Sequence, residues 1–375
     1  MKIPLFKMYY ENDDVEAVSD VIRRGSYWAL GPEIERFEKA IAAFVGRKYA
    51  LAFNSGTSAL HTLLLAHDVK GKEVIVPSFT FIATANAVVL AGGKPVFAET
   101  EHDTFGLDAE DVRKKITKDT KAIIPLHYGG STSKHIEELR KIAKDHNLIL
   151  IEDAAESLGS SLRGKKAGTF GDSAMFSFCQ NKVIATGEGG IIVTDDENVF
   201  ERCKLFRSHG RVELKEDYFS SAKDNDYIIA GFNYRMPAMV AALGLSQFSK
   251  MEKIVNMRKN IAKRYDEAFR QIKGIKLMDL KDNISVHQMY TITLEDERTR
   301  DALQEHLMKS GVMTKIYFCP VHLKTLYKRD WHYNEGDLPK TEDLSRRVLS
   351  LPLYPTLSDA EVNQVIDGVR SYFIN

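Results

Sequence analysis

Residues 148–153 read LILIED, an apolar run that ends in two carboxylates, Glu152 and Asp153. Four consecutive apolar residues of this kind are typical of a strand covered on both faces. Similar short runs alternate with helical patterns from Lys48 to about Asp195, as in parallel βαβ units. We therefore expect an α/β fold with a large, mostly parallel seven-stranded sheet between helices. The predicted strands are 48–53, 73–76, 94–98, 121–125, 148–152, 174–178 and 190–194, and the predicted helices between them are 57–65, 81–91, 109–116 and 136–146.

A second, smaller unit is predicted in the C-terminal third of the chain. A helix rich in Ala and Leu follows Pro237, and a charged helical pattern then runs from Met251 to about Gln271. We interpret it as a helix that links a large domain, residues 1–250, to a small α+β domain, residues 251–375. An N-terminal arm, residues 1–12, is expected to pack on the small domain, and the polar segment 215–226 is predicted to be a surface loop. Within the small domain we predict strands at 275–277, 289–293 and 313–317, and helices at 301–309 and 358–373.

Composition excludes several classes of protein. The 52 Lys and Arg residues balance 52 Asp and Glu residues, so the chain has no net charge to attract nucleic acid or anionic lipid. The longest apolar stretch, 81–91, is too short to span a membrane, and the N-terminus lacks a signal-peptide pattern. The three cysteines form no CxxC pair and no metal-binding pattern. We expect a cytoplasmic protein with no metal, no nucleic-acid partner and no membrane partner.

The sequence NSGTS at 54–58 stands where a predicted strand ends and a helix begins. Gly56 permits a close approach to the backbone, and Thr57 and Ser58 offer hydroxyl groups at the positive end of a helix. This arrangement suits a phosphate group. It equally suits an ordinary helix N-cap with a glycine turn, because Ser and Thr are favoured caps.

Two further features lie at strand ends. Glu152 and Asp153 occupy the carboxyl edge of the sheet, where such an acid binds a metal, pairs with a cationic ring nitrogen or caps the next helix. Metal binding is the least favoured, since no histidine cluster stands nearby. Lys182 follows the strand at 174–178 and precedes a glycine-rich turn, so it is either a Schiff-base lysine or a solvated loop lysine. A phosphate cradle, a strand-end aspartate and a lysine are the three parts that pyridoxal phosphate (PLP) requires.

The motifs together resemble the DegT/DnrJ/StrS family of nucleotide-sugar aminotransferases. The resemblance extends over nearly the whole chain, and several ordered motifs are a stronger signal than any one of them. It implies the fold type I (aspartate aminotransferase-like) architecture and PLP as cofactor. The motifs that carry it are NSGTSAL at 54–60, PSFTF at 77–81, ATANA at 83–87, EDAAES at 152–157, FSFCQNK at 176–182, TGEGG at 186–190 and GFNYRM at 231–236.

The resemblance implies roles for residues around the cofactor ring. Lys182 is expected to be the catalytic residue that bonds the cofactor and moves a proton, and Asp153 to pair with the protonated ring nitrogen. Phe81 is expected to cover one face of the ring. Glu156 stands beside the ring hydroxyl, where many relatives carry Gln or His, and an acid there must be protonated or receive the phenolic proton. Dehydratases of the family carry histidine in place of the lysine, so Lys182 favours transamination.

The resemblance also implies which residues hold the cofactor's phosphate, and that two subunits share each active site. Gly56, Thr57 and Ser177 are expected to hold the phosphate. Asn233 is expected to reach the phosphate of the neighbouring subunit's cofactor, so that a homodimer with shared active sites is the catalytic unit.

For the sugar substrate, residues 316–323, IYFCPVHL, resemble the stretch of the family that meets the acceptor. His322 and Tyr317 are the candidates for contact with sugar hydroxyls, and a satisfied structural histidine is the alternative reading of His322. Trp28 either shapes the sugar pocket or packs in an interface. His127 ends a strand near the cofactor region and has no role assigned.

The function implied by the resemblance is PLP-dependent transfer of an amino group from L-glutamate to a keto carbon of a nucleotide-linked sugar. Amination at C4 of a 4-keto-6-deoxyhexose, as in perosamine-type synthesis, is favoured over C3 amination of a 3-keto sugar. Two other classes stay open. A PLP lyase would share the fold and Lys182, and a non-catalytic sensor would keep the phosphate cradle but not need a Schiff-base lysine.

Overall fold

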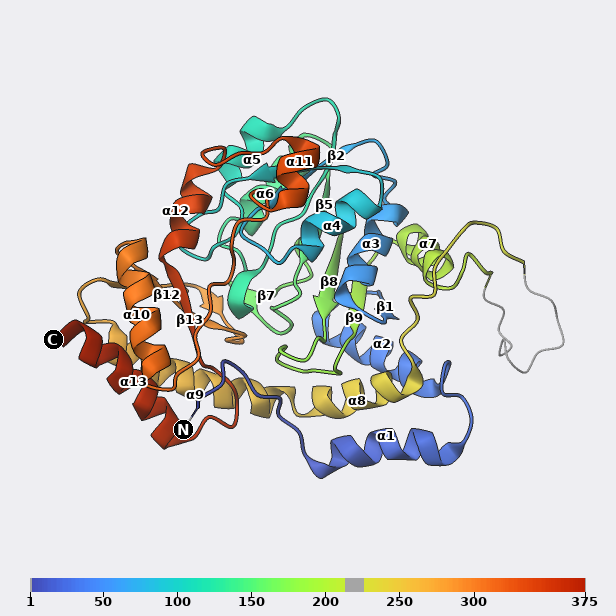
Figure 1. Cartoon of the computed structure of the whole chain (residues 1–375). Helices are drawn as coiled ribbons and strands as arrows, with labels where there is room; N and C mark the ends of the chain where they lie inside the picture. Colours follow the sequence, from blue (N-terminus) through green and yellow to red (C-terminus); the bar gives the residue numbers. More distant parts are fainter. Residues whose placement is uncertain (1, 213–225, 375) are drawn as a thin grey trace.

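The computed structural model describes residues 2–212 and 226–374. A seven-stranded sheet forms its centre, in the order β1-β9-β8-β5-β4-β2-β3 (Figure 1). β9 is antiparallel to both of its neighbours, and all other neighbouring pairs are parallel. The predicted α/β class and mostly parallel sheet are confirmed. The strands are β1 (Tyr49–Phe53), β2 (Glu73–Pro77), β3 (Lys94–Ala98), β4 (Thr120–Ile123), β5 (Ile149–Asp153), β8 (Ser173–Ser177) and β9 (Gly190–Thr194).

Helices cover both faces of this sheet because its strands are apolar on both sides. On β5, Ile151 belongs to one hydrophobic cluster and Leu150 to another. The first cluster contains α3 (Gly56–Ala66), α4 (Ala83–Leu90) and α7 (Glu197–Arg207). The opposite face is covered by α5 (Ala109–Lys115) and α6 (Ile136–Asp145) near β2 to β5, and by α2 (Pro32–Val45) near β1. The four helices predicted between strands are confirmed to within two residues.

The N-terminal region adds two helices that the sequence analysis did not anticipate, α2 and α1 (Asn12–Arg24). α1 packs on α8 (Ala238–Ser249), and Lys250 at the end of α8 donates a 2.8 Å hydrogen bond to the buried carboxylate of Asp14. Ahead of α1, Ile3 is fully buried and bridges to Val312. Ile3 therefore lies in the C-terminal core.

The C-terminal part contains a three-stranded sheet, β10 (Ile275–Leu277), β12 (Tyr290–Leu294) and β13 (Val348–Leu351), in that order. The strand predicted at 313–317 is wrong: this segment makes single bridges at Val312 and Lys315 and then crosses to the large sheet, where Val321 N–H bonds the carbonyl of Ser78 at 2.9 Å. β13 takes its place in the sheet. The helices are α9 (Met251–Phe269), α10 (Glu297–Lys309), α11 (Thr325–Trp331), α12 (Pro339–Arg347) and α13 (Asp359–Ile374).

Segments beyond residue 250 also pack against the part of the chain that carries the large sheet. Val321, Tyr327 and Leu338 belong to the same hydrophobic cluster as β2 and β3. β11 (Asn283–Ile284) pairs with β6 (Ser161–Leu162), which pairs with β7 (Lys165–Lys166). The domain boundary at residue 250 stays a prediction. Of the loop predicted at 215–226, residues 215–225 lie outside the described residues. Of the helices described, none is long and apolar enough to cross a membrane.

Candidate active site

Three of the motifs follow strands that point the same way. β1 and β8 are both antiparallel to β9, and β5 is parallel to β8, so all three end at one edge of the sheet. β1 leads into residues 54–58, β5 into 153–157 and β8 into 177–182. Carboxyl ends of parallel strands meet at a common edge, which is where ligands of α/β proteins bind.

The turn after β1 is capped by Ser55 and packs closely against the ends of β8 and β9. Ser55 caps α3, because its hydroxyl oxygen accepts the N–H of Ser58 at 3.1 Å. Gly56 and Thr57 follow in the first turn, where amides have no partner within the helix. A Cβ on Gly56 would lie 3.0 Å from Cβ and 3.2 Å from Oγ of Ser177, and a Cβ on Gly190 would lie 2.5 Å from the carbonyl oxygen of Ser55. Both glycines are therefore required by close packing of α3 against the ends of β8 and β9.

Asp153, the last residue of β5, is buried with both carboxylate oxygens bonded. Thr84 donates its hydroxyl to Oδ2 at 2.7 Å, and the N–H of Ala155 donates to Oδ1 at 3.2 Å. Burial raises the pKa of Asp153, and the hydrogen bonds and the charge of Lys182 only partly offset it. Thr84 stands within the ATANA motif, but its contact with Asp153 could not be read from spacing.

Lys182 lies over the same strand end. Its Nζ is 3.5 Å from Oε1 of Glu156, and 13% of its side chain is exposed. Oε2 of Glu156 accepts the N–H of Gly129 at 2.9 Å. Burial raises the pKa of Glu156, while Lys182 and the Gly129 N–H lower it, and the negative charge of Asp153 adds to the rise. The tertiary structure thus brings Lys182, Asp153 and Glu156 into one buried cluster.

Glu152, the neighbour of Asp153, points to the other face of the sheet. Its Oε2 accepts hydrogen bonds from Nε2 of His127 at 2.8 Å and from Gly168 N–H at 2.7 Å, and its Oε1 accepts Gly171 N–H at 2.6 Å. Burial acts to raise the pKa of Glu152, but these hydrogen bonds outweigh it, so the net shift is downward. Nδ1 of His127 accepts the N–H of Ser133, which leaves the proton on Nε2. Only Asp153 of the two strand-end acids belongs to the cluster.

A contact that the sequence analysis missed holds the Lys182 loop. Gln288 is buried and donates its amide N–H to the carbonyl of Asn181. The backbone carbonyl of Gln288 accepts a hydrogen bond from the buried Arg258 guanidinium of α9 at 3.3 Å. Burial lowers the pKa of Arg258 to about 10. No sequence signal marked Gln288, because it lies 106 residues beyond Lys182 in an irregular segment.

Phe81 and Asn233 are exposed. Phe81 precedes α4 with 63% of its surface exposed. The backbone of Asn233 bridges to Ser208, and its carbonyl accepts the side chain of Asn54 at 3.4 Å, which places Asn233 beside the turn after β1. Neither residue is enclosed by the described part of the chain.

Tyr317 lies near the cluster and Trp28 does not. Tyr317 shares a cavity of about 20 Å³ with Asn181 and Gln288. Burial, and then the charge of Glu156, raise the pKa of the Tyr317 phenol. Trp28 stands between α1 and α2, where its indole N–H donates to the carbonyl of Val21 at 3.0 Å.

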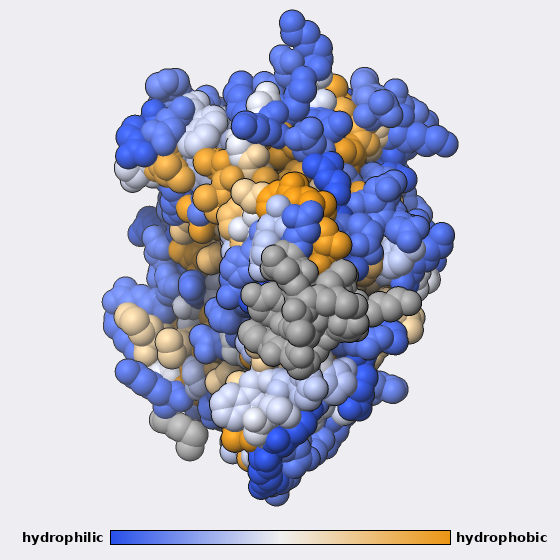
Figure 2. Space-filling view, turned by 90° about the vertical axis from the view of Figure 1, so that its right-hand side faces the viewer, coloured by the Kyte–Doolittle hydropathy of each residue, from blue (hydrophilic) through white to orange (hydrophobic). Residues whose placement is uncertain are grey.

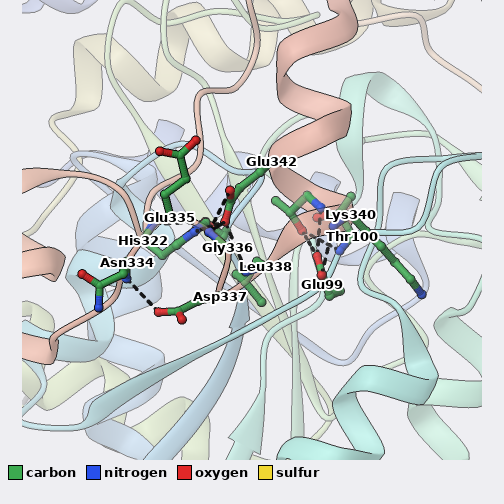
Figure 3. A network of polar contacts seen from close by, with 12 residues as sticks. Glu99, Thr100, His322, Asn334, Glu335, Gly336, Asp337, Leu338, Lys340 and Glu342 are labelled. Carbon is green, nitrogen blue, oxygen red and sulfur yellow. Dashed lines mark hydrogen bonds and ion pairs between the residues drawn. The ribbon is translucent and has the colours of Figure 1, made fainter. Parts of the chain in front are cut away.

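His322 belongs to a buried network (Figure 3) rather than to an open pocket. Its Nδ1 is 2.7 Å from Oγ of Ser78, and its Nε2 is 3.2 Å from Oε1 of Glu342. Glu342 also accepts the N–H groups of Gly336 and Leu338. Both ring nitrogens of His322 are thus occupied within the protein. This arrangement favours the interpretation of His322 as a structural histidine, because neither ring nitrogen is left to bond a sugar hydroxyl.

The chain is similar to known proteins over almost its whole length. Residues 9–370 match the model of the DegT/DnrJ/EryC1/StrS aminotransferase family. The chain belongs to this family. It is 33% identical to the GDP-perosamine synthase of Vibrio cholerae, with 99% of each chain covered. Among solved structures it resembles PseC of Helicobacter pylori, an aminotransferase of pseudoaminic acid biosynthesis (TM-score 0.92, 31% identity, 100% of each chain). It also resembles the PLP form of Spr1654, a putative sugar aminotransferase from Streptococcus pneumoniae (TM-score 0.89, 25% identity, 100% of this chain and 99% of the other).

Family membership settles the class of enzyme. The protein is a PLP-dependent sugar aminotransferase with the fold of that family, which uses an amino donor and a nucleotide sugar as substrates. The resemblance inferred from the motifs, the cofactor and the enzyme class are confirmed.

Proposed function

We propose that this aminotransferase moves an amino group from L-glutamate to C4 of a nucleotide-linked 4-keto-6-deoxyhexose, the reaction type of perosamine synthesis. The observation that carries the proposal is the amine of Lys182 held 3.5 Å from Glu156 beside the buried acid Asp153. The similarity to the GDP-perosamine synthase of Vibrio cholerae supports C4 as the position of amination.

The residues present fit PLP. The cofactor carries an aldehyde, a basic ring nitrogen and a phosphate, and the site offers an amine, a buried carboxylate and an anion cradle. The absence of a side chain at Gly56 keeps the cradle open, since a Cβ there would lie 3.0 Å from Cβ and 3.2 Å from Oγ of Ser177. We assign the phosphate to the N–H groups of Gly56 and Thr57 and to the hydroxyl of Ser177.

When bound, PLP withdraws electrons from the donor's α-carbon, so that a proton can leave it. Lys182 is the base that removes this proton and returns it at the other end of the half-reaction. Asp153 holds a proton at the ring nitrogen, and its two hydrogen bonds, from Thr84 and Ala155, fix its direction. Phe81 would cover one face of the ring, and Glu156 would lie beside the ring hydroxyl.

For the sugar we retain Tyr317 as a contact, because it borders the Lys182 loop. For Trp28, which stands between α1 and α2 with its indole N–H on the carbonyl of Val21, we propose contact with the sugar in an assembled dimer.

We further propose a homodimer with shared active sites. Large apolar side chains are exposed on segments that flank the site: Phe81, Leu90, Ile228 and Phe232. Figure 2, which looks at the side where residues 226–232 lie, has apolar surface between hydrophilic areas. Exposed apolar area of this kind is typical of a protein interface. Asn233 lies in the same segment, exposed beside the turn after β1.

The test begins with the absorbance spectrum of PLP-loaded protein before and after addition of L-glutamate, with Lys182→Ala as control. We expect glutamate to convert the spectrum to that of pyridoxamine phosphate only when Lys182 is present. The loaded enzyme is then given nucleotide-linked 4-keto- and 3-keto-6-deoxyhexoses, and NMR of the product locates the new amine. Amine at C3, or no turnover with either sugar, would overturn the C4 proposal.

A further inference from the structure

Lys182 and Glu156 form an ion pair that is shielded from water. The exposed fractions of the two side chains are 13% and 7%. Oε1 of Glu156 is 3.5 Å from Nζ of Lys182, and Oε2 accepts the N–H of Gly129. A buried charge is costly unless it is paired, so the ionised state of Glu156 depends on this partner.

Among the described residues, the other groups that interact with Glu156 supply no positive charge. Asp153 adds a negative charge, which favours the protonated form of Glu156. The phenols of Tyr128 and Tyr317 also interact with Glu156, and both are neutral because burial raises their pKa. Lys182 is therefore the cation on which the negative charge of Glu156 relies.

We propose that Glu156 takes up a proton whenever Lys182 loses its ammonium charge, so that the two residues share one proton between them. Breaking a buried ion pair by removing one partner leaves an uncompensated charge, and a carboxyl group relieves this by becoming neutral. The burial that raises the pKa of Glu156 then acts without the opposing charge of Lys182. A neutral Glu156 can donate a hydrogen bond, as the amide of glutamine does.

The proposal extends to covalent attachment of the cofactor, and in this step it rests on the proposed function. When Nζ forms a C=N bond with an aldehyde, the carbonyl oxygen leaves as water. Two of the three ammonium hydrogens enter that water, and the third leaves as a proton. We assign this proton to Oε1 of Glu156, so that it is retained in the site.

The first experiment uses protein without cofactor. Infrared spectra are compared for Lys182→Met, which removes the charge, and Lys182→Arg, which keeps it. At neutral pH we expect the C=O band of a protonated carboxyl group in Lys182→Met and not in Lys182→Arg. The band should disappear from the double variant Lys182→Met, Glu156→Gln. The absence of this band from folded Lys182→Met would overturn the proposal. A band that persists in Lys182→Met, Glu156→Gln but disappears from Lys182→Met, Asp153→Asn would also overturn it, since Asp153 would then hold the proton.

The second experiment counts protons released when pyridoxal phosphate is added to weakly buffered protein. Wild-type protein should retain the proton, and Glu156→Gln should release about one more per site. Equal release by the two proteins, with the cofactor bound to both, would contradict the proton assignment. If pyridoxal phosphate did not bind covalently, the proposed function would fall, while the infrared result would still decide the pairing of Glu156 with Lys182.

Discussion

Adjacent acids at the end of β5 have pKa values displaced in opposite directions. The pKa of Asp153 is raised, because burial outweighs its two hydrogen bonds. The pKa of Glu152 is lowered, because the hydrogen bonds from His127 and from two backbone N–H groups outweigh burial. An acid with a raised pKa in the folded state destabilises the protein as pH rises through the interval between its unfolded and folded pKa. An acid with a lowered pKa stabilises the protein above its unfolded pKa and loses this effect as pH falls.

We therefore predict that Asp153→Asn makes the cofactor-free protein more stable at neutral pH while abolishing transamination. The expected gain in Tm is roughly 1–3 °C, and it should vanish below the unfolded pKa of the acid. Glu152→Gln should do the reverse and lower Tm at neutral pH, with the loss shrinking as pH falls. Thermal unfolding across a pH series checks both variants. Identical Tm curves for Asp153→Asn and wild type would contradict the prediction.

Gln288 offers a way to loosen the Lys182 loop without unfolding the chain. Its Nε2 donates to the Asn181 carbonyl, whereas its Oε1 is buried with no hydrogen-bond partner in the described part of the chain. Gln288→Leu removes the first contact and also the unpaired oxygen, so we expect little change in Tm. Misplacement of Lys182 should lower kcat about 10- to 100-fold, with a smaller effect on KM.

Gln364→Leu is the matched control for Gln288→Leu. Gln364 makes a similar hydrogen bond, to the carbonyl of Ser310 at 2.8 Å, on the exposed surface of α13. Steady-state kinetics and Tm are measured for both variants. We expect the two variants to differ mainly in kcat, which should fall only in Gln288→Leu. Unchanged kcat in that variant would show that Asn181 is fixed by other contacts.

At the scale of elements, the site depends on how closely α3 approaches β8. The Cβ introduced by Gly56→Ala would lie 3.0 Å from Cβ of Ser177, so either the first turn of α3 or the end of β8 must move. We predict that pyridoxal phosphate binds roughly 10-fold more weakly, because overpacking of this kind typically costs about 1–3 kcal/mol. Fluorescence titration with the cofactor measures the affinity. Wild-type affinity in the variant would exclude this turn as the phosphate cradle.

The segment around His322 acts at the same scale. His322 and Val321 bond Ser78, which directly follows β2 in the segment that leads to Phe81, and Glu342 ties His322 to the start of α12. Glu99 lies beside this network and accepts the N–H groups of Lys340 and Thr341 at the same helix end (Figure 3). The C-terminal part of the chain is thereby fixed to the loop that carries Phe81.

At the scale of the whole molecule, the proposed shared site makes a quantitative prediction. Lys182→Ala and Asn233→Ala chains are each expected to be inactive as homodimers. A heterodimer of the two holds one intact site, if Asn233 serves the partner's cofactor. An equal mixture, after unfolding and refolding together, should therefore regain about a quarter of wild-type activity. No recovery, with heterodimers demonstrated by native mass spectrometry, would show that Asn233 does not act across the interface.

Much of the site was predictable because its parts are local. Gly56, Asp153 and Lys182 each follow an apolar run that ends at a polar residue, and such runs become parallel strands with a common carboxyl edge. The contacts between these parts were not predictable. Each contact joins residues that are distant in sequence. Thr84 lies 69 residues from Asp153, Gly129 lies 27 residues from Glu156, and Gln288 lies 107 residues from Asn181.

By itself, the sequence determined the succession along the chain of the seven strands and of the four helices predicted between them, and the family to which the chain belongs, since both depend on short patterns along the chain. The tertiary structure decided which of two adjacent acids joins Lys182, that His322 is enclosed rather than open, and that 348–351 rather than 313–317 completes the small sheet. These outcomes depend on burial and on partners distant in sequence. Residue type and spacing specify neither.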